Sequence, residues 1–387
     1  MKVAIVCDWL TNVGGAERVL KSIHDLFPKA PIYTSQYDKE GIDWFKDADV
    51  RTGWLQKFSP KLRRFLAPLR QIYFNHLDLS DYDLIISVTG AEAKSIKKGK
   101  ATHICYCHVP TQYYWQLYDD YLTDPGFGAL NGFVRFFFKI LVKPLRRADF
   151  AAAQRPDYFI TISTYAAEQI KKYYKRESVI IAPPVAVEKF STGEFSTGSR
   201  ETKQTKSQVP NEHNKTIKMQ KRQGYISTSR QVVWKRLDLA VKACKKLNEP
   251  LILIGDGPEH KRLQKFVGND PIVTFLPSMD QDSLRHYLSE AKGFIFPSLE
   301  PFGIAPVEAL AAGCPVIAYG KGGAVDYVID GENGILFSNQ SVASLVSALK
   351  KFKTKEFDPV KVAKTALPFS EDIFKTKIKK FINEKIS

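Results

Sequence analysis

Short apolar runs alternate with helix-like segments along almost the whole chain, and this alternation constrains the fold more than any other feature. The runs have the length of strands in the first half, and the same pattern returns in the second half. Strands that alternate with helices favour doubly wound parallel sheets. Because the 387 residues exceed the roughly 250–300 at which one core stops growing, we expect two domains, each with its own sheet.

The individual elements follow from the spacing of apolar residues. We expect strands at 3–7, 84–88, 103–108 and 158–162, and again at 250–254, 272–275, 293–296 and 315–318. Helical spacing predicts helices at 16–27, 165–174, 236–247 and 283–291. Apolar residues at helical spacing between Ile373 and Ile382 predict a last helix that packs on the body of the protein.

A polar stretch separates the two halves. Residues 191–222 hold seven Lys or Arg against three Glu and hardly an apolar residue. Such a composition buries too little apolar area to offset the entropy of ordering, so it predicts a linker, with nucleic-acid binding as the alternative. The expected domains are an amino-terminal one at 1–185, a linker at 186–224 with this insertion, a carboxyl-terminal one at 225–368 and a helix at 369–387.

Composition limits the compartment and the partners. No apolar run reaches the about 18 residues that suggest a membrane-spanning helix, and the first residues predict a strand rather than a cleaved leader. Five scattered cysteines predict no disulfide framework and favour the reducing cytoplasm. The formal net charge of +16 favours an anionic partner: nucleic acid, a phosphorylated small molecule or an acidic membrane surface.

The densest functional pattern lies at residues 296–318. A strand is expected to end there, a loop carries Glu300 and Gly303, and a helix is expected to begin near Ile304. Free N–H groups at the positive end of that helix suit a phosphate. Glu300 in the loop and Glu308 in the expected first turn face the same space, where carboxylates accept hydrogen bonds from sugar hydroxyls. Acids that simply stabilise a helix start are the alternative.

This stretch resembles the signature of the retaining glycosyltransferases of family 4, E-P-F-G…E-A-x-A-x-G-x-P-V-I, at nearly every position. Residues 253–258 are similar to the family's G-x-G-P loop, and Gly322-Gly323 to its G-G-x-x-E turn, although Asp326 stands where the family has Glu. The resemblance implies the GT-B fold, an α/β arrangement of two Rossmann-like, doubly wound parallel-sheet domains facing across a cleft. The donor-binding residues that it implies in this half are Gly255, Gly257, Phe302, Gly303, Ile304 and Glu308.

Residues 228–238 resemble the family's R-x(4)-K-R-x-D segment, with Ser229 in place of the usual Gly. Arg230 and Lys235 would then be the two cations that hold the donor diphosphate. Fixed cations stabilise the charge that grows on a leaving diphosphate as the glycosidic bond breaks. Basic residues on a solvated face beside a strand are the alternative.

Two places in the amino-terminal half resemble the family more loosely. Gly14 and Gly15 stand in its first strand–loop–helix, where paired glycines let the backbone approach the donor phosphate and the acceptor. His108, followed by Pro and aromatic residues, resembles the strand-end His beside the reacting face of the donor sugar; a packed histidine is the alternative.

A zinc site is a competing interpretation of the same strand. His103, Cys105 and Cys107 share one face, and His108 follows them. Residues at a spacing of two cannot close a tetrahedral site without a distant partner, and no second Cys pair is present. We therefore expect no metal ligands here.

Two stretches combine basic and aromatic residues without any acid. Residues 51–76 hold six Lys or Arg and a helical apolar stripe that Pro68 would kink, and residues 133–147 hold five Lys or Arg among phenylalanines. Such stretches suit an anionic membrane surface. A core-facing helix with a solvated basic side is the alternative.

The resemblance implies a retaining hexosyltransferase of a bacterial mannosyltransferase branch in cell-surface polysaccharide biosynthesis. GDP-mannose is the favoured nucleotide-sugar donor, with a UDP-hexose as the alternative, and the acceptor is a glycan or a polyprenyl-linked glycan. We expect catalytic roles for His108, Arg230, Lys235 and Glu300, no metal cofactor, and a cytoplasmic, peripheral location at the inner face of the cell membrane. The other hypotheses are a non-catalytic binding protein with this fold and a nucleic-acid-binding protein, for which no recognised module is present.

Overall fold

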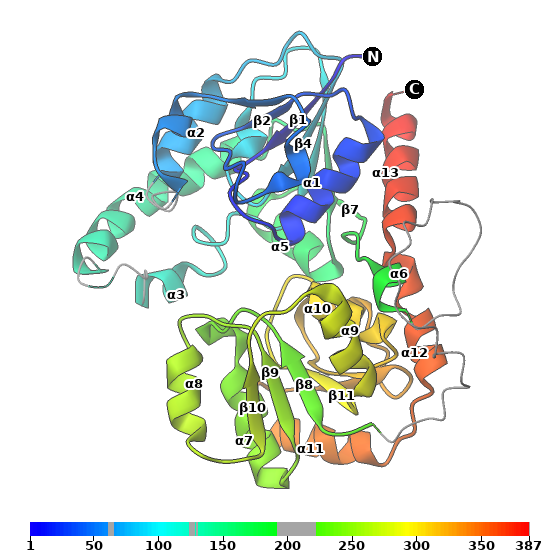
Figure 1. The fold of residues 1–387 in the computed structure, drawn as a ribbon. Helices are drawn as coiled ribbons and strands as arrows, with labels where there is room; N and C mark the ends of the chain where they lie inside the picture. The colour runs from blue at the N-terminus through cyan, green and yellow to red at the C-terminus, as the bar shows by residue number, and fades with distance from the viewer. Residues whose placement is uncertain (61–65, 124–127, 129–130, 192–221, 387) are drawn as a thin grey trace. The chain divides into compact units, whose positions relative to one another are not determined.

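The chain folds as two α/β units. The computed structural model describes residues 1–60, 66–123, 128, 131–191 and 222–386. The first unit comprises Met1–Pro184 and Glu371–Ser387, and the second comprises Val185–Ser370. Each described unit is built on one parallel sheet (Figure 1), which confirms the expected fold class. The insertion expected at 191–222 lies outside the described residues, except for its two end residues.

The described part of the first unit contains a seven-stranded sheet in which all neighbours pair in parallel. Its strand order reverses direction between β1 and β4. In spatial order the strands are β3 (Val50–Thr52), β2 (Ile32–Thr34), β1 (Val3–Cys7), β4 (Leu84–Thr89), β5 (Thr102–Cys107), β6 (Tyr158–Thr161) and β7 (Val179–Ile180).

The described part of the second unit contains a six-stranded parallel sheet, whose order reverses between β8 and β11. In spatial order the strands are β10 (Val273–Leu276), β9 (Leu251–Ile254), β8 (Tyr225–Thr228), β11 (Gly293–Phe296), β12 (Val316–Tyr319) and β13 (Gly334–Phe337). Ligands of open α/β sheets bind outside the carboxyl ends of the strands at such a reversal.

Helices cover both sheets, so central strands are buried on both faces. Every residue of β4 and β11 is buried, which explains why these strands appear in the sequence as continuous apolar runs. The helices of the first unit are α1 (Gly15–Leu26), α2 (Ala67–His76), α3 (Tyr118–Thr123), α4 (Asn131–Ala152), α5 (Thr164–Tyr174) and α13 (Glu371–Ile386). Those of the second are α6 (Val187–Phe190), α7 (Leu237–Leu247), α8 (His260–Val267), α9 (Gln281–Glu290), α10 (Ile304–Ala311), α11 (Val342–Lys353) and α12 (Pro359–Lys364).

Local signals set where several helices begin. The Ser163 side chain accepts from the backbone N–H of Ala166 at the start of α5, and Asp280 does the same for Ser283 at the start of α9. Pro68 lies in the first turn of α2, where proline is tolerated. The kink that we expected at Pro68 is therefore a helix start; residues 61–65 of the expected stripe lie outside the described residues.

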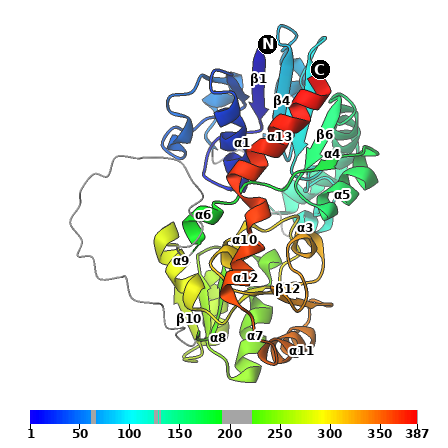
Figure 2. The ribbon, with the colours of Figure 1, turned by 90° about the vertical axis from the view of Figure 1, so that its right-hand side faces the viewer.

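The last helix returns to the first unit. Phe374, Ile378, Phe381 and Ile382 are buried on one side of α13, which packs against α1 (Figure 2). Lys375 pairs with Asp25 of α1 at 2.9 Å. No helix within the described ranges is both long and apolar enough to cross a bilayer.

Candidate active site

The second unit gathers most of the expected donor residues at the carboxyl edge of its sheet. The loops that follow β8, β9, β11 and β12 carry Arg230 and Lys235, Gly255 and Gly257, Glu300 and Gly303, and Gly322 and Gly323 respectively. Because β8 and β11 flank the reversal in strand order, their loops meet at the place where open α/β sheets bind ligands.

Lys235 and Glu300 form an ion pair at this reversal. The Lys235 Nζ lies 2.5 Å from the Glu300 Oε1, and the Ser298 hydroxyl donates to the same oxygen at 2.7 Å. The side chains are 19% and 18% exposed, so the pair is partly desolvated yet reachable. The pair joins residues that are 65 apart in sequence. Its cation could bind a phosphate group of a ligand, and its carboxylate could accept hydrogen bonds from hydroxyl groups.

Arg230 projects from the loop after β8. Its side chain is exposed, and it makes no hydrogen bond or ion pair with any residue that the structure describes. Its predicted neighbour Lys235 is instead anchored on Glu300. The two predicted diphosphate cations therefore differ, since one is held in place and the other is unpaired within the described chain.

Glycines allow the loops to approach closely. A Cβ at Gly255 would lie 2.4 Å from the carbonyl oxygen of Ser229, and Gly255 has a φ of +119°. A Cβ at Gly323 would lie 2.4 Å from the carbonyl oxygen of Pro301, and the Gly323 N–H donates to the Glu300 carbonyl at 2.8 Å. The glycine pair after β12 thus holds the loop that carries Glu300.

The helix at this loop begins as expected but places two residues differently. Gly303, with a φ of +91°, precedes α10, and Ile304 is its first residue, so both N–H groups stand at the helix start. Glu308 is the fifth residue and is buried, so our expectation of a first-turn acid is wrong. Phe302 is buried against Tyr327, with ring centroids 5.4 Å apart, which leaves only its backbone for a ligand.

The reversal in the first sheet is organised by Asp8, at the carboxyl end of β1. Its carboxylate accepts from the Thr89 hydroxyl at 2.9 Å and from the backbone N–H groups of Gly90, Ala91 and Ala93 at 2.8–3.1 Å. These four donors hold the loop after β4 against the end of β1. Sequence reasoning missed this role because the donors lie more than 80 residues away.

His108 directly follows β5 at the same edge. Its Nε2 is buried without a hydrogen-bond partner among the described residues, and its ring lies edge-on to Tyr106, with centroids 5.5 Å apart. Burial lowers the pKa of His108 to about 4, against an effect of Asp8 in the other direction. A neutral imidazole with one unused ring nitrogen can donate to or accept from a sugar hydroxyl.

Gly14 and Gly15 stand at the start of α1. Gly14 is the N-cap residue in an extended conformation, and a Cβ there would lie 2.8 Å from the Glu17 Oε2. The glycine therefore makes room for Glu17, a buried acid in the first turn. The expected approach to a phosphate stays a prediction.

Two buried ion pairs hold the loop after β4, the loop that donates hydrogen bonds to Asp8. Arg70 of α2 pairs with Glu92 at 2.9 Å and lies over the Trp9 ring, and Lys94 pairs with Asp149 of α4 at 2.6 Å. Burial opposes the charge of Lys94, but Asp149 holds its pKa well above the usual value. Arg70, counted above among the basic residues of a membrane-facing stretch, is thus an interior cation.

The cysteine strand has no metal-site geometry. His103 shares a hydrogen bond of 2.8 Å with the Ser87 hydroxyl, and burial lowers its pKa to about 3. All five cysteines are free and buried. Within the described ranges no group of three or more His, Cys, Asp or Glu residues could hold a metal ion.

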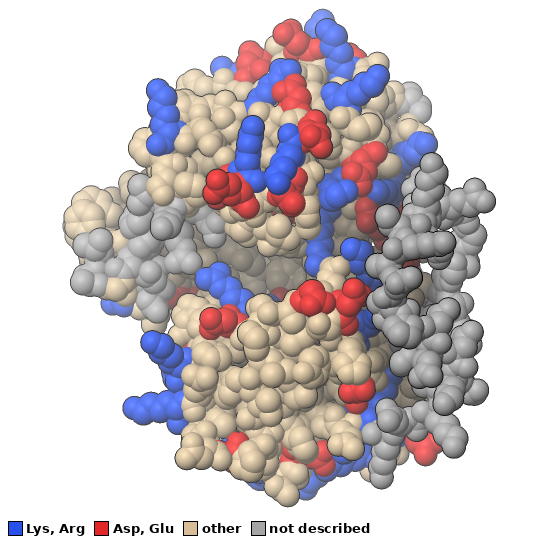
Figure 3. Space-filling view, viewed as in Figure 1, with Lys and Arg blue, Asp and Glu red and all other residues tan. Residues whose placement is uncertain are grey.

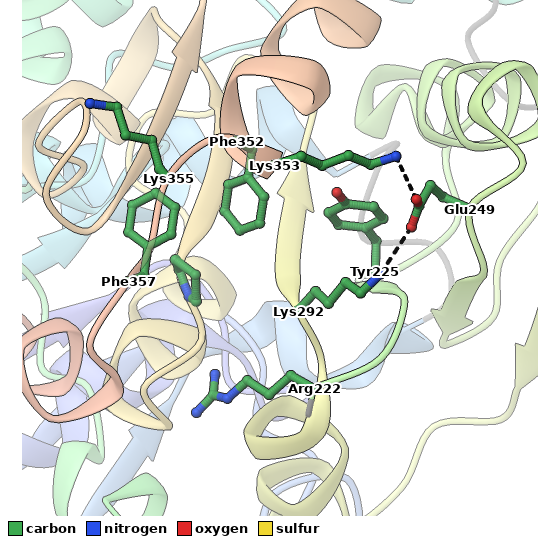
Figure 4. Close-up of a pocket in the computed structure, with 9 residues that line it drawn as sticks. Arg222, Tyr225, Glu249, Lys292, Phe352, Lys353, Lys355 and Phe357 are labelled. Atoms are coloured by element: carbon green, nitrogen blue, oxygen red, sulfur yellow. Dashed lines mark hydrogen bonds and ion pairs between the residues drawn. The ribbon is translucent and has the colours of Figure 1, made fainter. Parts of the chain in front are cut away.

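A separate pocket lies at the opposite edge of the second sheet (Figure 4). It has a volume of about 340 Å³, and Tyr225, Lys292 and Pro315 line it at the amino ends of strands. Glu249 pairs with Lys292 at 3.4 Å and with Lys353 at 2.5 Å. Because its residues precede the strands, this pocket is not the candidate site at the carboxyl edge.

Solved structures define the class of the fold. The structure resembles the lipopolysaccharide outer core galactosyltransferase WaaB, with a TM-score of 0.67, 15% identity and all of both chains covered. It also resembles Anabaena HepE in complex with UDP, with a TM-score of 0.67, 17% identity, and 99% of this chain and all of the other covered. The two parallel-sheet units thus have the GT-B glycosyltransferase fold.

The sequence of the second unit is similar to a known group of enzymes. Residues 208–367, less than half of the chain, match the model of glycosyl transferases group 1. The chain is 25% identical to an alpha-1,3/1,6-mannosyltransferase of Schizosaccharomyces pombe, covering 84% of this chain and 68% of the relative. It is 24% identical to the corresponding enzyme of Dictyostelium discoideum, covering 88% and 87%.

Proposed function

We propose that the chain is a retaining glycosyltransferase of family 4 that moves a hexosyl group from a nucleoside-diphosphate sugar. The observation that carries the proposal is the pairing of Lys235 with Glu300 at the strand reversal, beside the start of α10. Phosphate groups need cations and N–H donors, whereas sugar hydroxyls need a carboxylate. These three elements stand together here.

The proposed chemistry uses the leaving group as its own base. Arg230, Lys235 and the N–H groups of Gly303 and Ile304 would stabilise the charge that grows on the diphosphate. The acceptor hydroxyl would attack from the same face, and a diphosphate oxygen would take its proton, which retains the anomeric configuration. Glu300 would hold sugar hydroxyls when Lys235 turns to the phosphate, and Glu308 would hold the ribose.

In the first unit, His108 would form a hydrogen bond with the donor sugar, which requires that its buried Nε2 becomes accessible. The low pKa keeps the ring neutral near pH 7, so it would act through a hydrogen bond rather than as a cation. Gly14 and Gly15 would let the backbone approach the donor, as proposed from the sequence.

Mannose is the proposed sugar and GDP-mannose the proposed donor. The names of the two relatives, both mannosyltransferases, support mannose, whereas the UDP complex of HepE supports a UDP-hexose as the second candidate. A thermal-shift comparison of GDP-mannose, UDP-glucose and UDP-galactose tests the choice, because only the ligand that binds the folded chain raises the midpoint.

The proposed acceptor is a glycan on a polyprenyl lipid, in cell-surface polysaccharide biosynthesis at the cytoplasmic face of the membrane. The proposed reaction needs no metal, because two cations and a helix start already neutralise the diphosphate. Activity should therefore survive EDTA. Loss of activity with EDTA and its return with Mg²⁺ or Mn²⁺ would contradict this part of the proposal.

The test of the proposed site compares Arg230→Ala and Lys235→Ala with Lys242→Ala, an exposed lysine of α7. Each of the first two changes should lower kcat by about 10²–10³, since each removes charge stabilisation of the transition state. Circular dichroism should show that all three variants stay folded. Equal turnover in all three variants would show that Arg230 and Lys235 do not stabilise the leaving diphosphate. A wild type that binds donor but neither transfers nor hydrolyses it would instead favour the non-catalytic alternative.

The nucleic-acid alternative has less support. On the face seen in Figure 3, Lys and Arg side chains are interspersed with Asp and Glu rather than gathered in one stripe. Binding to nucleic acid should therefore be weak and vanish with added salt.

A further inference from the structure

Helix α4 is apolar on two opposite sides. Val142 and Ala152 are buried on the side that faces its own unit, together with the paired Asp149, and Phe138 packs on Tyr118 of α3, with ring centroids 5.5 Å apart. A second apolar set, which we call the outer face, points away from that side: Phe133, Phe136, Phe137, Ile140 and Leu141, at helical spacing. In Figure 1 the amino-terminal half of α4 extends outward from the sheet of its unit.

The outer face is exposed to an unusual degree. Phe133 and Phe136 are 65% and 61% exposed, and Ile140 is 55% exposed. The phenylalanines contact one another: the rings of Phe133 and Phe137 are 4.5 Å apart, and those of Phe136 and Phe137 are 5.4 Å apart. A contiguous exposed patch of this kind marks an interaction site rather than scattered surface apolar residues.

The charges of α4 that lie beside the outer face are all positive. Lys139, Lys143 and Arg147 form a row at i, i+4 and i+8, are exposed, and have no ion pair with any described residue. The other two cations of α4 are engaged, since Arg135 donates to the Thr123 carbonyl and Arg146 donates to the Tyr114 carbonyl at 2.5 Å.

Helix α3, which carries two acids, packs on the side of α4 away from the outer face. Asp119 and Asp120 belong to α3, which meets α4 through Phe138 and through Arg146, stacked on the Tyr118 ring at 4.6 Å. On a helical wheel Phe138 lies opposite the outer face. Among the charged residues of α4 itself, only this cation row borders the apolar patch.

We infer that the outer face of α4 inserts into the headgroup region of an anionic lipid surface. The row Lys139, Lys143 and Arg147 lies against lipid phosphates, while the phenylalanines enter the acyl boundary. An apolar patch with a one-signed basic border matches such a surface better than a second copy of the chain, which would bring a like-charged border.

The position of α4 relates lipid binding to the acceptor, an argument that rests on the proposed function. A helix between two parallel strands runs against them, so the amino-terminal half of α4 lies toward the carboxyl edge of the sheet, where His108 is. Asp149 joins α4 to that edge through Lys94 at 2.6 Å, Thr111 at 2.8 Å and Trp115 at 2.7 Å. Docking through α4 brings the edge that receives a lipid-linked acceptor to the membrane.

The two basic stretches that the sequence predicts as membrane-facing differ in how many of their apolar residues are exposed. In residues 51–76, Leu55, Arg70 and Phe74 are buried, Trp54, Phe58 and Ile72 are exposed, and residues 61–65 lie outside the described chain. The outer face of α4 has more exposed apolar residues on one described helix, beside a cation row, so we assign this surface to lipid.

Co-sedimentation with phosphatidylcholine vesicles, with and without phosphatidylglycerol, tests the inference. The wild type should bind only the anionic vesicles, and added salt should weaken binding. Lys139→Gln, Lys143→Gln and Arg147→Gln together should weaken it by more than tenfold, since each cation near an anionic leaflet strengthens binding by about fivefold. The matched control removes three exposed charges from α8, by Lys261→Gln, Arg262→Gln and Lys265→Gln, and should leave binding nearly unchanged.

The apolar part is tested by Phe133→Ser with Phe136→Ser, against Ile72→Ser in the other stretch, which is 50% exposed. The variant with both Phe changes should lose vesicle binding, whereas Ile72→Ser should keep it. Equal effects of the α4 and control changes overturn the inference, as does a wild type that ignores anionic vesicles. A wild type that is dimeric in light scattering, and monomeric after the Phe changes, would assign the face to a second copy instead. Donor hydrolysis is also measured in each variant. Because the outer face holds no donor-binding residue, loss of vesicle binding with unchanged hydrolysis concerns the lipid surface alone, whereas absence of hydrolysis in the wild type would count against the proposed function.

Discussion

The charge on Glu300 is the residue-scale feature that sets the candidate site apart from a solvated surface pair. Glu300→Gln keeps the shape of the side chain and its hydrogen bond with Ser298 but loses the charge that pairs with Lys235. The neutral amide is a weaker acceptor for sugar hydroxyls, so we expect kcat to fall about 10²-fold while KM for the donor changes little. Steady-state kinetics with Glu290→Gln, an exposed acid of α9, as the control checks this. A rise in KM alone would assign Glu300 to binding only.

A second prediction at this scale concerns acid. The pKa of His108 is about 4 in the folded chain, below the ordinary value of 6.5. The unfolded chain therefore binds a proton between these values that the folded chain does not, so stability falls as pH falls through this window. The loss is at most about 3 kcal/mol. Urea unfolding across the window should show a smaller loss in His108→Gln than in the wild type. Parallel curves would mean that the ring is protonated in the folded chain.

Residues were predictable where a local motif carries them. Glu300, Lys235 and the glycines near them stand in short patterns that tie residue type to spacing. Asp8 and Lys94 were missed because their partners lie 81 and 55 residues away, and a lone charged residue in a sequence carries no sign of such a partner. Burial of Glu308 and Phe302 was missed because it depends on how the loop packs.

Among the secondary-structure elements, predictability followed burial. The expected strands at 84–88 and 293–296 match β4 and β11 closely, since both are buried on two faces and appear as apolar runs. The strands that we did not expect include β3 and β7, with three and two residues, too short for a periodic signal. The region of helix α4 was expected as a basic aromatic stretch at 133–147, with a core-facing helix as the alternative, because apolar residues on two opposite sides obscure a single helical stripe.

The pair Lys94 with Asp149 lets us test how strongly α4 is joined to the loop after β4. Lys94→Met leaves the buried Asp149 carboxylate without its cation, which should lower the free energy of unfolding by about 3–5 kcal/mol. Lys94→Met with Asp149→Leu removes both charges and should recover part of the loss, although Trp115 and Tyr174 lose an acceptor. The control is Lys171→Met, whose fully exposed pair with Glu177 should hardly change the free energy of unfolding. Urea unfolding measures all of them. If the double variant is no more stable than Lys94→Met, the hydrogen bonds that Trp115 and Tyr174 donate to Asp149, rather than the ion pair, hold the two elements together.

The whole molecule is not two consecutive domains, because its end returns to its beginning. The chain leaves the first unit after Pro184, forms the second unit, and comes back at Glu371. The sequence predicted the helix from its apolar spacing but not the surface that it covers, since periodicity shows that a helix has an apolar side and not what lies against it. Two crossings between units mean that the first unit is complete only after the last residues have folded.

This connectivity predicts that damage to the last helix is felt at the first one. Phe374 is 2% exposed and lies 5.9 Å from the Tyr106 ring, whereas its neighbour Ile373 is 37% exposed. Phe374→Ser should therefore destabilise the first unit by about 3–5 kcal/mol through the cavity that it leaves, and Ile373→Ser should have little effect. Hydrogen exchange should accelerate in α1 and in β5 of the Phe374 variant, while α7 and α11 of the second unit keep wild-type protection. Uniform acceleration in both units would mean that they unfold as one cooperative body, and unchanged exchange in α1 would mean that α13 contributes nothing to the unit on which it packs.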